Sequence, residues 1–214
     1  MSTFPNNKKL NLTINTNANN EKITTIYSEN PKPLLSSYKF IKGFEEGILD
    51  FYSVKRNNVS ESVLKISDFK IQEVPVLAKL LTLASLQGIA DLLTGEGIRF
   101  DDFELKFTSK DKLMRIDELY AIGPAISIMM EGYIEKNNLI SLKGTLVPAT
   151  TINRTIASIP LLGNILVGKK VGEGVFGVSF KIKGPKDKLK TTVNPIKTLT
   201  PRFITRTLEK LKKN

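Results

Sequence analysis

The chain has 214 residues, a formal net charge of +11, and neither histidine nor cysteine. Without cysteine, disulfides, thiolate nucleophiles and thiolate zinc sites are excluded, and without histidine the commonest acid–base group and metal ligand is missing. The sequence therefore predicts no enzyme, no metal site and no cofactor. The 41% of hydrophobic residues suffices for a core, and the length predicts one large domain, or one and a half.

Most of the positive charge lies near the C-terminus. Residues 180–214 contain eleven Lys or Arg and two acidic residues, so +9 of the net +11 lies there. This asymmetry predicts a tail that meets an anionic surface, either lipid head groups or nucleic acid.

The first third of the chain is typical of short strands. Alternating runs at 10–14 and 23–27 flank a polar loop and predict a β-hairpin. We expect a short helix within 31–40, and then strands at 47–55 and 62–72. The N-terminus has no apolar segment of the kind found in signal peptides, so none is predicted.

The most apolar stretch, 75–93, is predicted to form one amphipathic helix. Lys79, Gln87, Gly88 and Asp91 interrupt it, whereas a membrane-spanning helix needs ~20 apolar residues with few or no charges. We therefore expect this helix to lie on a sheet or an interface, and we expect no transmembrane helix.

Strands resume after this helix. The alternation of apolar residues across 98–107 shifts by one residue at Asp101-Asp102, which predicts a β-bulge there. Tight turns then separate three further strands, at 112–121, 125–135 and 138–147. Short strands at such spacing indicate an antiparallel meander.

The last quarter of the chain is more varied. The segment 148–170 is irregular, with a short helix expected near 152–158. A one-faced strand is predicted at 176–182 and a second at 189–193. A basic amphipathic helix is predicted to begin near Pro201, because apolar residues recur there at helical spacing.

Two glycine-rich motifs match known nucleotide-binding loops only by coincidence. Gly163–Lys170 resembles a phosphate-binding loop, but its last position is lysine where a Ser or Thr would bind magnesium. Gly172–Val178 matches the glycine-rich loop of protein kinases, but only 37 residues follow Gly177, too few for the catalytic lobe.

The predicted fold is mainly β with helices (α+β). We expect a curved antiparallel sheet whose apolar face forms a groove, with the amphipathic helix at 75–93 and the basic C-terminal helix attached. The predicted parts are an N-terminal hairpin (1–30), a β-rich domain (31–200) and the C-terminal helix (201–214).

Two sets of residues are candidates for binding. Apolar residues that alternate along two strands are candidate lipid contacts in the groove: Leu142, Leu146, Phe176, Val178, Phe180 and Ile182. An ordinary core beneath a helix explains their pattern equally well. The tail residues that could enter a membrane interface are Arg202, Phe203, Arg206, Leu208, Lys210, Leu211, Lys212 and Lys213. A solvated terminal helix is the alternative for this second set.

Several short pieces between about Ser67 and Thr207 share their order and spacing with a known family. They are Ile66–Phe69, Ala78–Ile89, Gly95–Phe100, Gly144–Ala149, Ile159–Gly163, Gly174–Val178, Gly184-Pro185 and Val193–Pro195. In these pieces the chain resembles the AsmA-like C-terminal region of large bacterial envelope proteins of the YhdP/TamB type. The resemblance is looser over 30–65 and nearly absent before residue 30.

The resemblance implies a β-rich groove with an apolar inner face, a place in the bacterial envelope on the periplasmic side, and a part in phospholipid transport or outer-membrane maintenance. It implies phospholipid, an anionic membrane surface and an upstream AsmA-like chain as partners, and no catalytic residues. The alternatives are a basic nucleic-acid-binding protein and a structural cap or remnant of a split larger protein. The scarcity of aromatic residues outside alternating positions disfavours nucleic acid.

Overall fold

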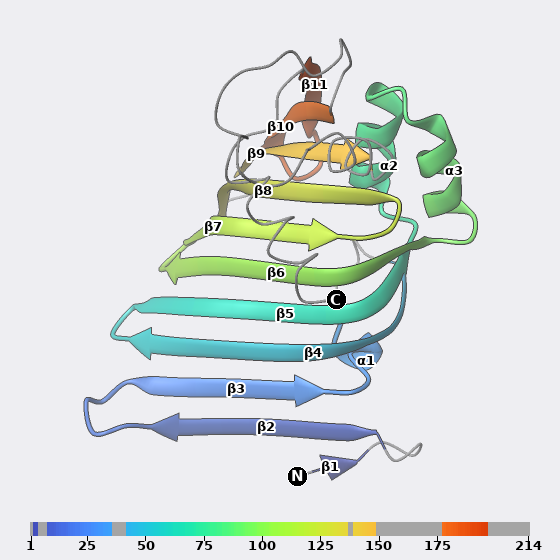
Figure 1. Ribbon diagram of the computed structural model, residues 1–214. Helices are drawn as coiled ribbons and strands as arrows, with labels where there is room; N and C mark the ends of the chain where they lie inside the picture. Colours follow the sequence, from blue (N-terminus) through green and yellow to red (C-terminus); the bar gives the residue numbers. More distant parts are fainter. Residues whose placement is uncertain (1, 4–7, 36–41, 137–138, 149–176, 197–214) are drawn as a thin grey trace, which may run out of the picture.

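The computed structural model describes residues 2–3, 8–35, 42–136, 139–148 and 177–196. These residues form one antiparallel sheet of eleven strands, which follow one another across the sheet in chain order (Figure 1). The strands are β1 Ser2–Thr3, β2 Lys9–Thr16, β3 Lys22–Ser28, β4 Lys42–Arg56, β5 Val59–Gln72, β6 Ile98–Lys110, β7 Leu113–Ile122, β8 Ile126–Glu135, β9 Leu139–Pro148, β10 Gly177–Pro185 and β11 Lys190–Ile196. Among the described strands β1 and β11 are the two edges, so the sheet is open.

The fold is mainly β, as predicted. The N-terminal hairpin and the antiparallel meander are confirmed, and the hairpin continues directly into the sheet because β3 pairs with β4. Short turns connect β4 to β5 and β6 to β7 at one end of the sheet, which we call the turn end. The three helices among the described residues lie at the other end, which we call the helix end (Figure 1). They are α1 Lys32–Leu35, α2 Pro75–Leu83 and α3 Gln87–Thr94.

The single helix predicted at 75–93 is wrong, because two helices occupy this segment. Helix α2 starts with Pro75, whose fixed backbone angle suits the first helical turn. It ends before Ser85, which has a φ of +59°, and the Leu86 N–H donates back to the Leu81 carbonyl at 2.8 Å. This left-handed residue turns the chain, so α2 and α3 pack together and α2 reaches β11.

The β-bulge predicted at Asp101-Asp102 is also wrong. Ser67 pairs with Asp102 and Phe69 pairs with Phe100, so one residue of each strand lies between these pairs. On β5 that residue is Asp68, with a φ of +52°. In both strands the side chains therefore switch faces at the same point, which is a change of phase, and the residue pairing keeps its register on either side. The register shifts of this region occur within β7, around residues 117–118, where it pairs with β6 and β8.

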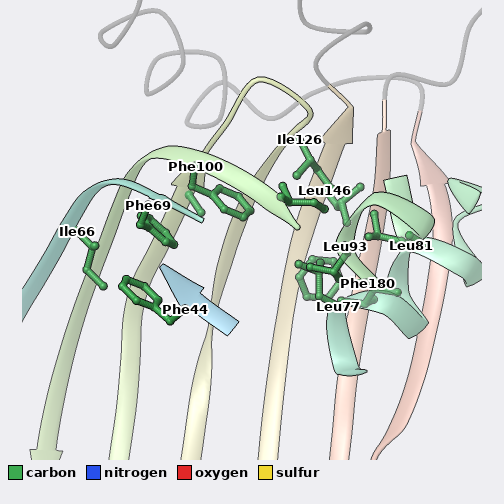
Figure 2. Packing of buried hydrophobic residues seen from close by; sticks show 14 of the residues in the cluster. Phe44, Ile66, Phe69, Leu77, Leu81, Leu93, Phe100, Ile126, Leu146 and Phe180 are labelled. Atoms are coloured by element: carbon green, nitrogen blue, oxygen red, sulfur yellow. The ribbon is translucent and has the colours of Figure 1, made fainter. Parts of the chain in front are cut away.

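The change of phase places three phenylalanine rings in a stack at the helix end. The centroids of Phe44 and Phe69 are 5.4 Å apart, and those of Phe69 and Phe100 are 5.5 Å apart, with nearly parallel planes. Figure 2 shows this stack beside the residues that the helices contribute. The core thus lies at the helix end, between one face of the sheet and α2–α3.

Candidate functional site

One face of the sheet carries an unbroken line of apolar residues. Strand register places them directly beside one another, one from each strand from β2 to β11, and we call this line the central row. It consists of Leu12, Ile26, Phe51, Leu64, Leu105, Leu119, Met130, Gly144, Phe180 and Val193. Because directly opposed residues share a face, the central row defines the apolar face of the sheet.

The central row is covered at one end and exposed at the other. Phe180 is only 2% exposed, whereas Leu12 is 58% exposed and its strand neighbour Ile14 is 52% exposed. The residues between β3 and β8 are half-buried. The apolar face therefore passes from a core beneath helices to a surface that meets solvent.

Helices α2 and α3 account for the covered end. Leu77, Leu81 and Leu93 of the helices belong to the same buried cluster as Leu146 and Phe180 (Figure 2). The Phe180 ring also lies against Gly144, where an added Cβ would be 2.5 Å from the ring Cζ. This part of the apolar face is closely packed protein interior.

The predicted lipid contacts lie at this covered end. The structure brings Leu146 and Val178 together as a cross-strand pair, and likewise Leu142 and Ile182. Leu146, Val178, Phe180 and Ile182 are buried, and Leu142 is half-buried and packs against them. Phe176 lies outside the described residues. The burial of these side chains favours a role in packing.

Sequence reasoning missed the part of the central row on β2 to β6, in which Leu12 is exposed and the other residues are half-buried. Each strand of β2 to β6 contributes one residue, namely Leu12, Ile26, Phe51, Leu64 and Leu105. The alternation within each strand was visible in the sequence, but the pairing register that aligns five strands was not.

On β3, β4 and β5 the apolar face becomes polar toward the turn end. Thr24, Ser53 and Ser62 form the next row, in which the Ser62 hydroxyl and the Ser53 oxygen lie 2.9 Å apart in a hydrogen bond. One step further, Lys22 and Lys55 oppose each other. This part of the apolar face is thus graded from hydrocarbon through hydroxyl to ammonium groups.

The opposite face of the sheet, which we call the polar face, carries ion pairs, but Tyr120, Ser127 and Val147 on this face are buried. Lys143 contacts Glu131 at 2.9 Å, and Lys106 contacts Glu104 at 2.9 Å. A hollow of about 390 Å³ on β7 to β11 has a mainly apolar lining that includes Met129 and Met130, with Lys143 and Ser179 among its polar residues.

The hairpin of β2 and β3 is held by carboxylates at both ends. Asn17 Nδ2 donates to Glu21 Oε2 at 2.7 Å and the Arg56 guanidinium also donates to Glu21, which together hold the pKa of Glu21 below its ordinary value. At the other end the Lys9 backbone N–H donates to Glu29 Oε2 at 2.8 Å and lowers the pKa of Glu29. The exposed end of the apolar face therefore has an anchored hairpin.

The predicted membrane-binding residues of the tail, from Arg202 to Lys213, lie outside the described residues. The helices that the structure describes include none with the length and apolar character needed to cross a bilayer.

No protein-family model matches the chain, and neither a curated protein nor a solved structure gives a significant match. The AsmA-like resemblance therefore stays a prediction.

Proposed function

We propose that the chain is a non-enzymatic lipid-handling module of the bacterial envelope, acting in phospholipid transport or outer-membrane maintenance. Its apolar face forms the floor of a groove for acyl chains. The observation that carries this proposal is the central row, which continues without a polar residue across ten strands and meets solvent at β2.

The length of the central row from β2 to β6 supports an acyl ligand. Neighbouring strands are ~4.8 Å apart, so the row from β2 to β6 is about 19 Å long. One leaflet of a bilayer has a hydrocarbon depth of about 15 Å, half of the ~30 Å core. An extended acyl chain therefore fits across these five strands.

The chemistry of the row suits hydrocarbon without selecting a particular lipid. Each CH₂ group removed from water contributes ~0.8 kcal/mol. A continuous line of Leu, Ile and Phe side chains offers that contact along its whole length and needs no specific hydrogen bond. A module that carries phospholipids of mixed chain composition requires this tolerance.

Native mass spectrometry of the full chain tests the proposal, because a bound phospholipid adds a defined mass. A fluorescence assay quantifies it: the chain has no tryptophan, so Phe51→Trp places a single reporter on the central row. Quenching by a phospholipid with dibrominated acyl chains is expected, since the bromines would lie beside the indole.

Matched variants separate the two faces. Leu12→Asn with Ile14→Asn removes exposed apolar side chains from the apolar face, and Ile48→Asn with Tyr52→Asn removes comparably exposed ones from the opposite face. The first pair should weaken quenching at least several-fold and the second pair should not. Equal effects of the two pairs, or salt-dependent binding of DNA or RNA with no lipid bound, would contradict the proposal.

The basic tail is proposed to hold the module on an anionic membrane surface. Its cations would each contribute ~1 kcal/mol near an anionic leaflet. Replacing Arg202, Arg206 and Lys210 with Glu should abolish co-sedimentation with vesicles rich in phosphatidylglycerol. Unchanged co-sedimentation would show that the tail does not hold the module on the membrane, and it would not affect the proposal for the central row.

A further inference from the structure

We infer that Lys22 and Lys55 form a binding site for a phosphate group, that of a phospholipid whose acyl chain lies on the central row. This inference rests on the proposed function and adds a recognised headgroup to it. It follows from the order of side chains along two paired strands.

Lys22 of β3 and Lys55 of β4 are directly opposed on the apolar face. The next pair along the same two strands is Thr24 with Ser53, and the pair after that is Ile26 with Phe51 of the central row. Ammonium, hydroxyl and hydrocarbon groups therefore follow one another along these two strands, in the order of the phosphate, the glycerol esters and the start of the chains of a phospholipid. Because the central row runs across the strands, a bound acyl chain would turn at Ile26 and Phe51 to follow it.

Strand β5 extends the same gradient. Ser60 opposes Lys55, Ser62 opposes Ser53, and Leu64 opposes Phe51. Three adjacent strands thus agree on where the surface is apolar and where it is polar. The polar residues of a solvated turn face water on either side of the sheet, so a turn alone does not require that the polar rows of three strands be aligned.

The lysine pair is unfavourable for the protein by itself. Side chains directly opposed across two strands have Cβ atoms roughly 4.5–5.5 Å apart, and like charges at that distance destabilise the sheet. Both lysines are exposed, and neither forms an ion pair within the described part of the chain. An anion shared by the two ammonium groups removes the repulsion and gains charge-assisted hydrogen bonds.

The lysine pair lies beyond the level at which a lipid phosphate would lie. Residues on one face of a strand are ~6.7 Å apart, so the hydroxyl row is one such step and the lysine pair two steps, roughly 13 Å, from the central row. The polar layer of one leaflet is about 5–7 Å deep. The flexible lysine stems can fold back toward a phosphate at this depth.

A second lysine pair provides a matched control. Lys183 and Lys190 are directly opposed on β10 and β11, and both are exposed, but they lie on the polar face. Replacing either pair with glutamine removes the same two charges from the same kind of cross-strand site. Only the pair on the apolar face has a hydrocarbon surface next to it.

The experiment compares phosphatidic acid with diacylglycerol of the same dibrominated chains, presented in neutral detergent micelles to the Phe51→Trp reporter. The unmodified lysine pair should favour phosphatidic acid. Lys22→Gln with Lys55→Gln should weaken phosphatidic acid binding roughly thirty-fold at low salt and leave diacylglycerol unchanged. Lys183→Gln with Lys190→Gln should keep the preference.

Each other result has a distinct meaning. If the Lys22/Lys55 variant keeps the preference for phosphatidic acid, the headgroup site is refuted while the acyl site stands. If neither lipid quenches the reporter, the proposed function itself fails. Displacement of phosphatidic acid by millimolar inorganic phosphate would assign the lysines to a soluble anion and overturn the lipid headgroup.

Thermal unfolding separates binding from structure. Removing a like-charge pair should leave the melting temperature of the lipid-free Lys22/Lys55 variant unchanged or slightly raised. A clear decrease would show that the two lysines stabilise the sheet, and it would overturn the inference.

Discussion

Leu12 and Phe180 occupy the same row of the same sheet, yet Leu12 is 58% exposed and Phe180 is 2% exposed. The difference does not come from the strands, which alternate in the same way at both positions. It comes from α2 and α3, which are inserted between β5 and β6 and lie over the later strands as far as β11. One sheet surface is thus protein core at one end and an exposed apolar surface at the other.

The largest expected effect is a loss of stability at the covered end of the apolar face. Phe180→Ala should lower the free energy of unfolding by about 3–5 kcal/mol, because it leaves a cavity in a closely packed region. Leu12→Ala should change it by no more than about 0.5 kcal/mol. Urea unfolding of both variants measures this contrast, and similar losses would show that the two ends are equally packed.

A smaller effect is expected from adding one methyl group. Gly144→Ala places a Cβ 2.5 Å from Phe180 Cζ and 2.3 Å from the Met129 carbonyl oxygen, so it should cost about 1–3 kcal/mol. Gly88→Ala is the control, since a Cβ there meets nothing within 4 Å and Gly88 is helical. That change should stabilise the protein by about 0.5–1 kcal/mol. Equal signs for the two variants would contradict the packing of Phe180 on Gly144.

A substitution at the junction of α2 and α3 is expected to stabilise the protein. Ser85 has a φ of +59°, which glycine adopts without the clash of a Cβ. Ser85→Gly should therefore raise the free energy of unfolding by up to about 1 kcal/mol, while Ser85→Ala should not. A loss of stability in Ser85→Gly, seen by urea unfolding, would show that the Ser85 side chain has a role in the cover.

The smallest effect concerns the anchored hairpin at the exposed end. Asn17→Ala removes the main cause of the lowered pKa of Glu21, so that pKa should rise toward its ordinary value of 4.5. A lowered carboxyl pKa contributes stability above pH 4.5 that is lost as the pH falls through the folded-state pKa. The variant should therefore show a weaker loss of stability between neutral and acidic pH. Carbon-detected NMR titration of Glu21 measures its pKa, and an unchanged value would exclude the Asn17 hydrogen bond as its cause.

The strands were largely predictable because their alternation is local. Apolar residues at every second position of 10–14 and 138–147, and the β-branched run at 23–26, predict the strands that the structure contains. The break between α2 and α3 was not predictable in the same way, because serine gives no signal for a left-handed residue. The phase change at Asp101 was visible, but its partner Asp68 on another strand, which keeps the ladder in register, was not.

The sequence predicted the kind of candidate site, an apolar face of a sheet, but not where on the sheet this face is uncovered. Alternation marks Phe180 and Leu12 equally as residues of an apolar face, and only the tertiary position of α2–α3 decides which is covered. The lysine pair was hidden for a related reason. Lys22 and Lys55 are 33 positions apart in the chain, and only the register between β3 and β4 makes them neighbours.

The strictly sequential order of the strands has a consequence for how such a molecule can vary. Every described strand pairs only with the strands before and after it in the chain, so inserting one whole hairpin before β4, or deleting that of β2 and β3, would leave the later pairings and the phenylalanine stack intact. Each hairpin would change the width of the sheet by about 9.6 Å. The contact between α2 and β11 makes the later strands a unit of fixed size. Width is therefore an adjustable property at one end of this architecture, much as repeat number is in solenoid proteins.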